Sequence, residues 1–332
     1  MRTDTHPREI LLGAQAACNM LPVCDHYSGT EVRMRKSLEL QAQLFKEFGT
    51  CVVDVTLDCE DGAAVGQEKE QANLVAGLLR TAESGCRVAT RVHPVNHPAF
   101  EEDIAIIVGE AGPQLSHIML PKVESVDDVL VAQRVLERAS GAHIPLHVLI
   151  ESPAAVQQSF DIASHPSVQS LSFGLMDFVS AHGGAIPASA MGVQGQFAHP
   201  LVVRAKLEIA AACHAHGKVP SHCVVTEFKD INALQTAALR ASQELGYTRM
   251  WSIHPAQIRT ILEAFAPAAQ EVQEAAEILQ AAAQESWAPV SYQGVLHDRA
   301  SYRYYWQLLE RAQRTGMALP EQARQWLTGS AA

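Results

Sequence analysis

Short apolar runs alternate with longer amphipathic stretches over most of the chain. Between about residue 15 and residue 265, most runs rich in Val, Ile and Leu are followed by a segment whose apolar positions recur at helical spacing. This alternation is typical of βα units. We expect strands at residues 16–24, 51–59, 87–93, 117–123, 145–151, 169–173, 219–225 and 249–254, with helices including 31–48, 67–83, 126–139, 201–216 and 232–245.

The number of strands predicts how the sheet closes. Eight strands, most of them followed by a helix, are what a closed parallel barrel of the TIM (β/α)8 type requires. An open doubly wound sheet is the rival, but the chain has no Gly-rich nucleotide turn after a strand and no GxxxxGK phosphate loop. We therefore predict an α/β fold with a TIM barrel.

The pattern changes after the eighth unit. A helix rich in Ala, Gln and Glu is expected at 268–285, a loop at 286–294 and a second helix at 301–314. We expect residues 1–265 to form the catalytic barrel and residues 266–332 to form a C-terminal helical extension. This extension is expected either to act as a lid, over its own or a neighbouring subunit, or to pack against the barrel flank.

Composition narrows the possible partners. Hydrophobic residues make up 48% of the chain, which suffices for a large core, and the net charge of −11 argues against nucleic acid. No apolar run is long enough for a membrane helix, so we expect no membrane association. Seven cysteines without a CxxC pair fit a reducing compartment, and we expect a cytoplasmic protein.

Polar residues gather where the expected strands end, which is where barrel enzymes place their chemistry. The ends read DCEDG at 58–62, RVHP at 91–94, PKVES at 121–125, ES at 151–152 and GLMD at 174–177. Carboxylates that converge on one barrel mouth repel each other unless a cation lies among them. Oxygen ligands favour Mg²⁺ or Mn²⁺ over zinc. The alternative for a single acid such as Asp61 or Asp177 is a role in the first turn of a helix.

Six motifs in order carry a resemblance to a known family. They are LDCEDG (57–62), RVHP (91–94), LPKVES (120–125), IES (150–152), FGLMD (173–177) and IHPAQ (253–257). Together they resemble the HpcH/HpaI aldolase and citrate lyase β-subunit family, which includes malyl-CoA and citramalyl-CoA lyases. The resemblance spans roughly residues 16–300.

The resemblance implies a homo-oligomeric barrel, a trimer or a hexamer, that binds Mg²⁺ through Glu151 and Asp177. It implies that Arg91 binds the carboxylate of a 2-oxo acid. Glu60 and Asp61 are expected to order neighbouring groups, and Lys122 to balance their charge.

The C-terminal extension also resembles this family. Residues 294–298 read GVLHD, similar to a G-x-M-x-D segment in members whose C-terminal lid reaches an adjacent subunit. There the Asp is an acid/base at the thioester α-carbon, which makes Asp298 a candidate. The alternative is that Asp298 caps the helix that follows it.

Two segments depart from the family pattern. Residues 21–29 read LPVCDHYSG where members resemble V-P-G-x-x-P/A-R, and residues 221–223 read SHC where many members have I-D-G. Cofactor and substrate contacts in these segments therefore cannot be carried over.

These observations predict a carbon–carbon lyase that cleaves or forms a 3-hydroxyacyl-CoA thioester, such as malyl-CoA or citramalyl-CoA, with a 2-oxo acid as the partner product. One alternative is a metal-dependent aldolase on free 4-hydroxy-2-oxo acids. Another is a citrate lyase β-like subunit that acts only with an acyl carrier partner.

Overall fold

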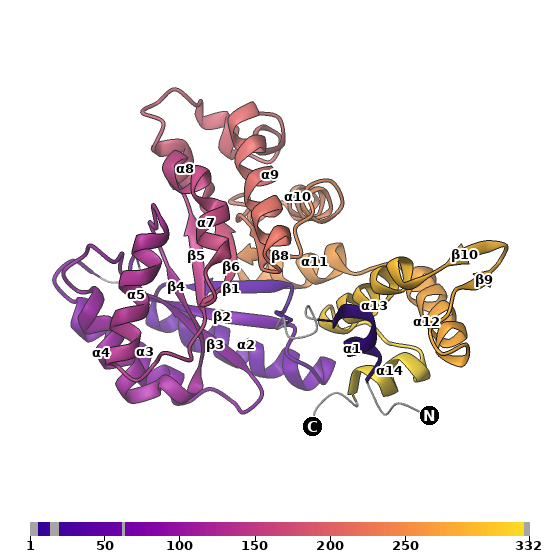
Figure 1. The fold of residues 1–332 in the computed structure, drawn as a ribbon. Helices are drawn as coiled ribbons and strands as arrows, with labels where there is room; N and C mark the ends of the chain where they lie inside the picture. Colours follow the sequence, from indigo (N-terminus) through magenta and orange to yellow (C-terminus); the bar gives the residue numbers. More distant parts are fainter. Residues whose placement is uncertain (1–5, 14–19, 62–63, 329–332) are drawn as a thin grey trace. The chain divides into compact units, whose positions relative to one another are not determined.

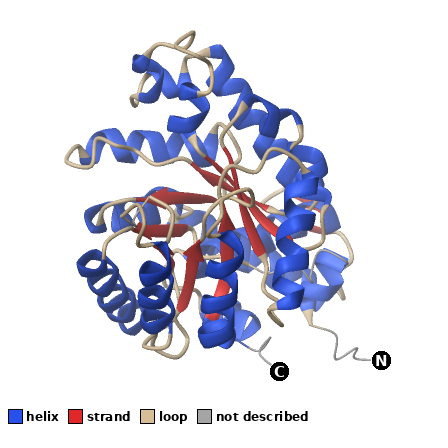
Figure 2. Ribbon diagram, turned by 90° about the vertical axis from the view of Figure 1, so that its left-hand side faces the viewer, coloured by secondary structure: helices blue, strands red, loops and turns tan. Residues whose placement is uncertain are grey.

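Eight parallel strands close into a barrel in chain order, with β1 hydrogen-bonded to β8 (Figure 1). The computed structural model describes residues 6–13, 20–61 and 64–328. Helices surround the strands (Figure 2), so the predicted (β/α)8 barrel is confirmed. The strands are β1 (Cys24–Ser28), β2 (Val53–Asp58), β3 (Arg87–Arg91), β4 (Leu115–Leu120), β5 (Leu146–Ile150), β6 (Val168–Phe173), β7 (Val219–His222) and β8 (Arg249–Ser252).

The helices of the barrel unit follow the strands. Common capping residues bound these helices. Gly49, whose φ of 66° is left-handed, directly follows α2, and a capping box between Ser125 and Asp128 starts α5. The helices are α2 (Glu31–Phe48), α3 (Glu68–Leu79), α4 (Phe100–Ala111), α5 (Val126–Arg138), α6 (Pro153–Gln157), α7 (Ser159–Ser164), α8 (Leu175–Ser180), α9 (Pro200–Ala215), α10 (Ile231–Gln243) and α11 (Pro255–Phe265).

The first strand lies later in the chain than the sequence predicted. The apolar run at 16–24 was expected to be this strand, and residues 16–19 lie outside the described part of the chain. The observed strand instead begins at Cys24 and runs through Asp25 and His26. The prediction was wrong because it looked for apolar residues. The observed strand carries polar side chains, which are buried inside the barrel beside polar partners.

The amino-terminal half of the barrel interior is polar and charge-balanced. Arg249 lies with its Nη2 atom 2.9 Å from Asp25 and 2.7 Å from Asp54, and Arg87 Nε lies 2.9 Å from Asp54. Two carboxylates thus face two guanidinium groups in a buried setting, where an unpaired charge would be costly. This network ties β1, β2, β3 and β8 together below the mouth.

A second compact unit contains the chain's first helix and the segment after the barrel. It comprises Met1–Met20 and Phe265–Ala332, and Leu21–Ala264 form the barrel unit. In this second unit α1 packs against α13, with Arg8 Nε 2.8 Å from Glu310. The expected loop at 286–294 contains β9, which pairs with β10, so that expectation was wrong in part. Its elements are α1 (Pro7–Leu12), α12 (Ala269–Gln284), β9 (Val290–Tyr292), β10 (Val295–His297), α13 (Arg299–Arg314) and α14 (Glu321–Thr328).

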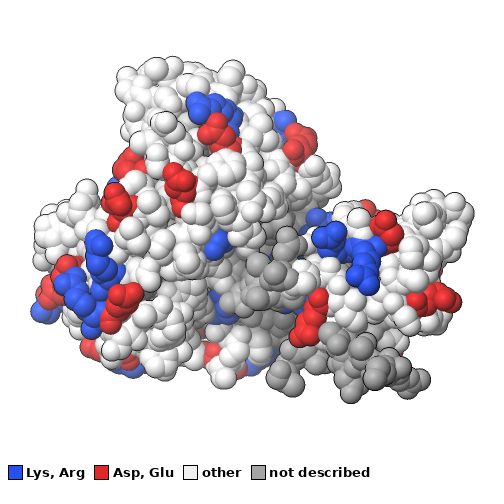
Figure 3. Space-filling model, in the orientation of Figure 1, with Lys and Arg blue, Asp and Glu red and all other residues white. Residues whose placement is uncertain are grey.

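Two further observations concern the surface. Within the described residues, every helix is too short or too polar to cross a bilayer. On the face drawn in Figure 3, basic side chains lie beside acidic ones instead of forming a basic patch of their own. Ion pairs such as Arg35 with Glu31 and Lys69 with Glu102 are of this kind.

Two stacked histidines inside the barrel predict an acid-sensitive fold. Burial lowers the pKa of His147 to about 3 and that of His117 well below its usual value. The unfolded chain therefore binds more protons than the folded chain below about pH 6.5, so stability falls as the pH drops from there towards 3. Replacing His117 by Asn and His147 by Gln should flatten this slope in urea unfolding experiments. His143→Gln, at an exposed position, is the control; an equal slope in the double variant and the wild type would contradict the assignment.

Candidate functional site

Charged residues from five neighbouring strands meet at the carboxyl end of the barrel. Asp58 and Arg91 are the last residues of β2 and β3 and are paired in register, while Glu151 directly follows β5. Lys122 follows β4, and Asp177 lies in the first turn of α8, after β6. The barrel thus brings the predicted residues of these strands to one end, as the sequence indicated.

Arg91 is bound by three carboxylates. Its Nε and Nη2 atoms donate to Asp58 at 2.7 and 3.0 Å, its Nη1 atom lies 2.9 Å from Glu60, and its Nη2 atom donates to Asp61 at 2.9 Å. These partners differ in access, because the Asp58 side chain is fully buried whereas that of Asp61 is 70% exposed. Asp61 is therefore more accessible to solvent than Asp58 or Glu60.

Two partners of Arg91 were not predicted, namely Asp58 and Tyr27. The Tyr27 hydroxyl accepts a hydrogen bond from Arg91 Nη2 at 3.0 Å and donates one to Asp58. Side chains alternate between the two faces of a strand, so Asp58 lies on the same face of β2 as Asp54. This alternation could have predicted that Asp58 points into the barrel. Tyr27 had no such signal, because the first strand was expected to end before it.

Lys122 connects two of the acids through different groups. Its ammonium lies 2.5 Å from Glu60, and its backbone N–H donates to Glu151 at 2.6 Å. The φ of Lys122 is 52°, a left-handed conformation that a residue with a side chain rarely adopts. The turn after β4 is thus held in a strained form that presents both groups to the acids.

Glu151 lies in a tight, largely buried position. A Cβ atom added to Gly174 would lie 2.6 Å from Glu151 Cβ and Oε2, so only glycine fits there. Burial and the neighbouring Asp177 carboxylate raise the pKa of Glu151 to about 7. Within the described part of the chain, neither Glu151 nor Asp177 forms an ion pair with Lys or Arg.

The cluster at the barrel mouth holds more acidic than basic side chains, which favours binding of a divalent cation. The cluster holds five carboxylates (Asp58, Glu60, Asp61, Glu151 and Asp177) and two cationic side chains (Arg91 and Lys122). The cationic groups are engaged by Asp58, Glu60 and Asp61. Glu151 and Asp177 carry carboxylate oxygens, the hard donors that Mg²⁺ prefers. The residues present therefore fit the expected metal.

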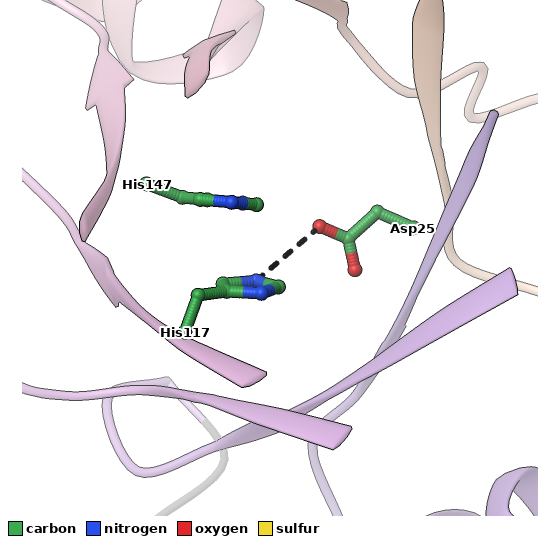
Figure 4. A group of neighbouring side chains, drawn as sticks. All are labelled: Asp25, His117 and His147. Carbon is green, nitrogen blue, oxygen red and sulfur yellow. Dashed lines mark ion pairs between the residues drawn. The ribbon is translucent and has the colours of Figure 1, made fainter. Parts of the chain in front are cut away.

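A second group of possible metal ligands lies deeper in the barrel. Ligand atoms of Asp25, His117 and His147 lie within 4.8 Å of one another, and all three residues are buried (Figure 4). The imidazole rings are stacked, with centroids 3.5 Å apart and planes 13° apart, so their nitrogen lone pairs lie in two nearly parallel planes. Arg249 already contacts Asp25, and two nitrogen ligands suit Mg²⁺ poorly. The carboxylate oxygens of Glu151 and Asp177 are donors of the kind that Mg²⁺ prefers.

Asp298 caps the helix that follows it, as one of the two interpretations proposed. Its Oδ1 atom accepts from the backbone N–H groups of Ala300 and Ser301 at 2.9 and 3.4 Å, and Ser301 Oγ accepts from the Asp298 N–H at 3.0 Å. The side chain is exposed at the start of α13. A catalytic role for Asp298, like the roles of the barrel residues, stays a prediction.

Comparison with known proteins places these residues in context. Residues 39–255 match the family model described as HpcH/HpaI aldolase/citrate lyase. An L-malyl-CoA/β-methylmalyl-CoA lyase of Cereibacter sphaeroides is 30% identical over 78% of this chain and 87% of its own length. A crystal structure of a citrate lyase from Burkholderia xenovorans is 49% identical, with a TM-score of 0.77 over 93% of this chain and 97% of that one.

A more distant structure shares the fold. The CitE protein of Mycobacterium tuberculosis, solved in complex with magnesium, acetoacetate and coenzyme A, is 22% identical. Its TM-score is 0.64, and the match covers 88% of this chain and 98% of that one.

The raised pKa of Glu151 leads to a direct test. Replacing Asp177 by Asn removes a neighbouring negative charge, so in metal-free protein the pKa of Glu151 should fall from about 7 towards its usual value. Infrared titration of the protonated carboxyl band measures this change. Glu244→Gln, on the exposed end of α10, is the control and should leave the titration unchanged. An unaltered titration in Asp177→Asn would show that the two carboxylates do not interact.

Proposed function

We propose, since this chain belongs to the HpcH/HpaI aldolase/citrate lyase family of carbon–carbon lyases, that it cleaves or forms a 3-hydroxyacyl-CoA thioester such as malyl-CoA or citramalyl-CoA. The products of cleavage are an acyl-CoA and a 2-oxo acid, glyoxylate or pyruvate. The observation that carries the proposal is the Glu151–Asp177 carboxylate pair beside the Arg91 network, a pair that forms no ion pair with Lys or Arg among the residues the structure describes. The similarity to a malyl-CoA lyase supports the choice of substrate.

Glu151 and Asp177 would hold Mg²⁺ or Mn²⁺ in this proposal. When bound there, the ion would supply Lewis acidity to the substrate. Arg91 binds the substrate's carboxylate with its planar guanidinium, which restricts rotation about the bond to be broken. Asp61 gives up its contact with Nη2 of Arg91 when the substrate carboxylate arrives. Glu60 and Lys122 stay paired and hold Arg91 and the turn after β4 in place.

In the chemical step, the substrate loses one proton from its hydroxyl group, and the thioester enolate gains one proton on carbon. The hydroxyl proton passes to solvent water, and the hydroxyl-bearing carbon becomes the carbonyl carbon of the 2-oxo acid as the C–C bond breaks. The electron pair of that bond passes to the thioester enolate. Asp298, from its own subunit or a neighbouring one, donates a proton to the enolate α-carbon. We propose a homo-oligomer, a trimer or hexamer, as the assembly in which this occurs.

The proposed metal centre is tested by Asp177→Ala. The variant should keep its circular dichroism spectrum and lose at least about 100-fold in Mg²⁺-dependent cleavage of malyl-CoA, because one of two protein ligands is gone. A coupled assay that detects glyoxylate or pyruvate measures the rate. Normal turnover in the variant would refute the assignment.

The same assay distinguishes the alternatives when the wild type is offered different substrates. Cleavage of free 4-hydroxy-2-oxo acids with no cleavage of thioesters would identify an aldolase. Turnover only after addition of an acyl carrier protein would identify a carrier-dependent subunit. Either result would replace the CoA-thioester proposal.

The role of Asp298 can be separated from its capping role. Asn caps helices about as well as Asp but cannot donate the required proton. Asp298→Asn should therefore keep the melting temperature and lose roughly 100-fold or more in turnover, the usual contribution of general acid–base catalysis. Asp298→Ser, which also caps, should behave in the same way. Full activity in both variants would leave Asp298 with the capping role alone.

A further inference from the structure

The orientation of Arg91 depends on a residue from the strand that departs from the family pattern. We propose that Tyr27 is a positioning residue that aims Arg91 Nη2 at the carboxylate of the 2-oxo acid. This inference rests on the proposed function, because it assigns Arg91 the task of binding that carboxylate. Tyr27 is supplied by β1, whose sequence at 21–29 differs from the family's first-strand segment.

Tyr27 contacts the guanidinium group in two ways. Its hydroxyl accepts from Nη2 at 3.0 Å, and the guanidinium carbon lies 4.9 Å from the centre of its ring. The same hydroxyl donates to Asp58, which in turn binds Nε and Nη2 of Arg91. The three side chains thus form a closed network across β1, β2 and β3, in which movement of one partner moves the others.

The ring of Tyr27 is itself held in place. It stacks against Trp251 of β8, with centroids 6.0 Å apart and planes 10° apart. Tyr27 and Trp251 belong to an apolar cluster with Met119 and Leu149 from the opposite side of the barrel. The hydroxyl therefore has a position fixed by packing from several strands, which is what a group that orients another must have.

The hydrogen bonds of Arg91 Nη2 indicate what the Tyr27 hydroxyl contributes to the orientation of the guanidinium group. Nη2 carries two hydrogens and lies within 3.0 Å of three acceptors, on Asp58, Asp61 and Tyr27. Asp58 and Asp61 each offset the positive charge of Arg91, whereas a neutral phenol accepts a hydrogen bond and leaves that charge for the substrate. Burial raises the pKa of Tyr27 above its usual range, so the phenol stays protonated across the working pH.

The three acceptors also differ in how easily they leave. Asp58 is fully buried and Tyr27 is packed against Trp251, whereas Asp61 is mostly exposed. The incoming carboxylate therefore takes the place of Asp61 while Tyr27 and Asp58 keep Nη2 in its plane. Without the hydroxyl, Nη2 has only carboxylates as partners and turns towards them, away from the substrate.

The test compares Tyr27→Phe with Tyr247→Phe. Tyr247 is a buried tyrosine that precedes β8 at the amino end of the barrel, and its hydroxyl donates to the Lys206 carbonyl at 3.0 Å. Each variant loses one hydroxyl, with two hydrogen bonds lost at Tyr27 and one at Tyr247, but only Tyr27 lies beside Arg91. Calorimetric titration with pyruvate in the presence of Mg²⁺ measures binding of the oxo acid, and titration with acetyl-CoA measures binding of the thioester.

We expect Tyr27→Phe to bind pyruvate about tenfold more weakly, as expected for a lost hydrogen bond to a charged group, with unchanged affinity for acetyl-CoA and Mg²⁺. Its KM for pyruvate in the condensation direction should rise by a similar factor, with a smaller change in kcat. Tyr247→Phe should bind pyruvate like the wild type. In an Arg91→Lys background, Tyr27→Phe should cause no further loss, because its effect passes through the guanidinium.

Each outcome bears on a definite claim. Equal pyruvate affinity in Tyr27→Phe and the wild type overturns the positioning role and leaves the proposed function intact. Pyruvate binding that depends on Tyr27, without turnover of any thioester, supports the positioning role and overturns the proposed function. A wild type that binds neither pyruvate nor glyoxylate in the same titration overturns both. An equal loss in Tyr247→Phe would show a general structural effect and would overturn the positioning role.

Discussion

Repulsion among carboxylates at the barrel mouth is the constraint on which the site depends. Five acids lie near one another at the ends of neighbouring strands, and the two cationic side chains among them are engaged by Asp58, Glu60 and Asp61. Glu151 and Asp177 form no ion pair with Lys or Arg in the described part of the chain, and burial together with the charge of Asp177 raises the pKa of Glu151. In the proposed function, a divalent cation would relieve this repulsion and would also supply Lewis acidity for cleavage of the carbon–carbon bond.

The two halves of the barrel interior differ in their balance of acidic and basic side chains. In the amino-terminal half, Arg249 and Arg87 balance the charges of Asp25 and Asp54, and burial lowers the pKa of His117 and His147, so the charges offset one another without a ligand. In the carboxyl-terminal half, acids exceed bases, and the proposed cation would offset this excess of negative charge. Stability is thus concentrated at one end and function at the other, as in other barrels of this type.

The barrel and the position of several site residues could be predicted from the sequence. The alternation of strands and helices predicts the fold, and in a parallel barrel the carboxyl ends of all strands lie at the same end. Glu151, Asp177 and Arg91 were placed there for that reason. The partners of Arg91 were harder to predict, since Asp58 reaches it through the register of β2 and β3, and Tyr27 through the true position of β1. The left-handed turn at Lys122 also has no sequence signal, because it is imposed by contacts with Glu60 and Glu151.

The most direct measurement is the location of a bound metal. Crystals soaked with Mn²⁺ and pyruvate give an anomalous signal at the ion, and Mn²⁺ prefers the same oxygen ligands as Mg²⁺. The account predicts one strong peak within coordination distance of carboxylate oxygens from both Glu151 and Asp177, with the oxo acid between the ion and Arg91. A peak at the His117–His147 pair instead, or an ordered pyruvate with no metal at Glu151, would contradict it.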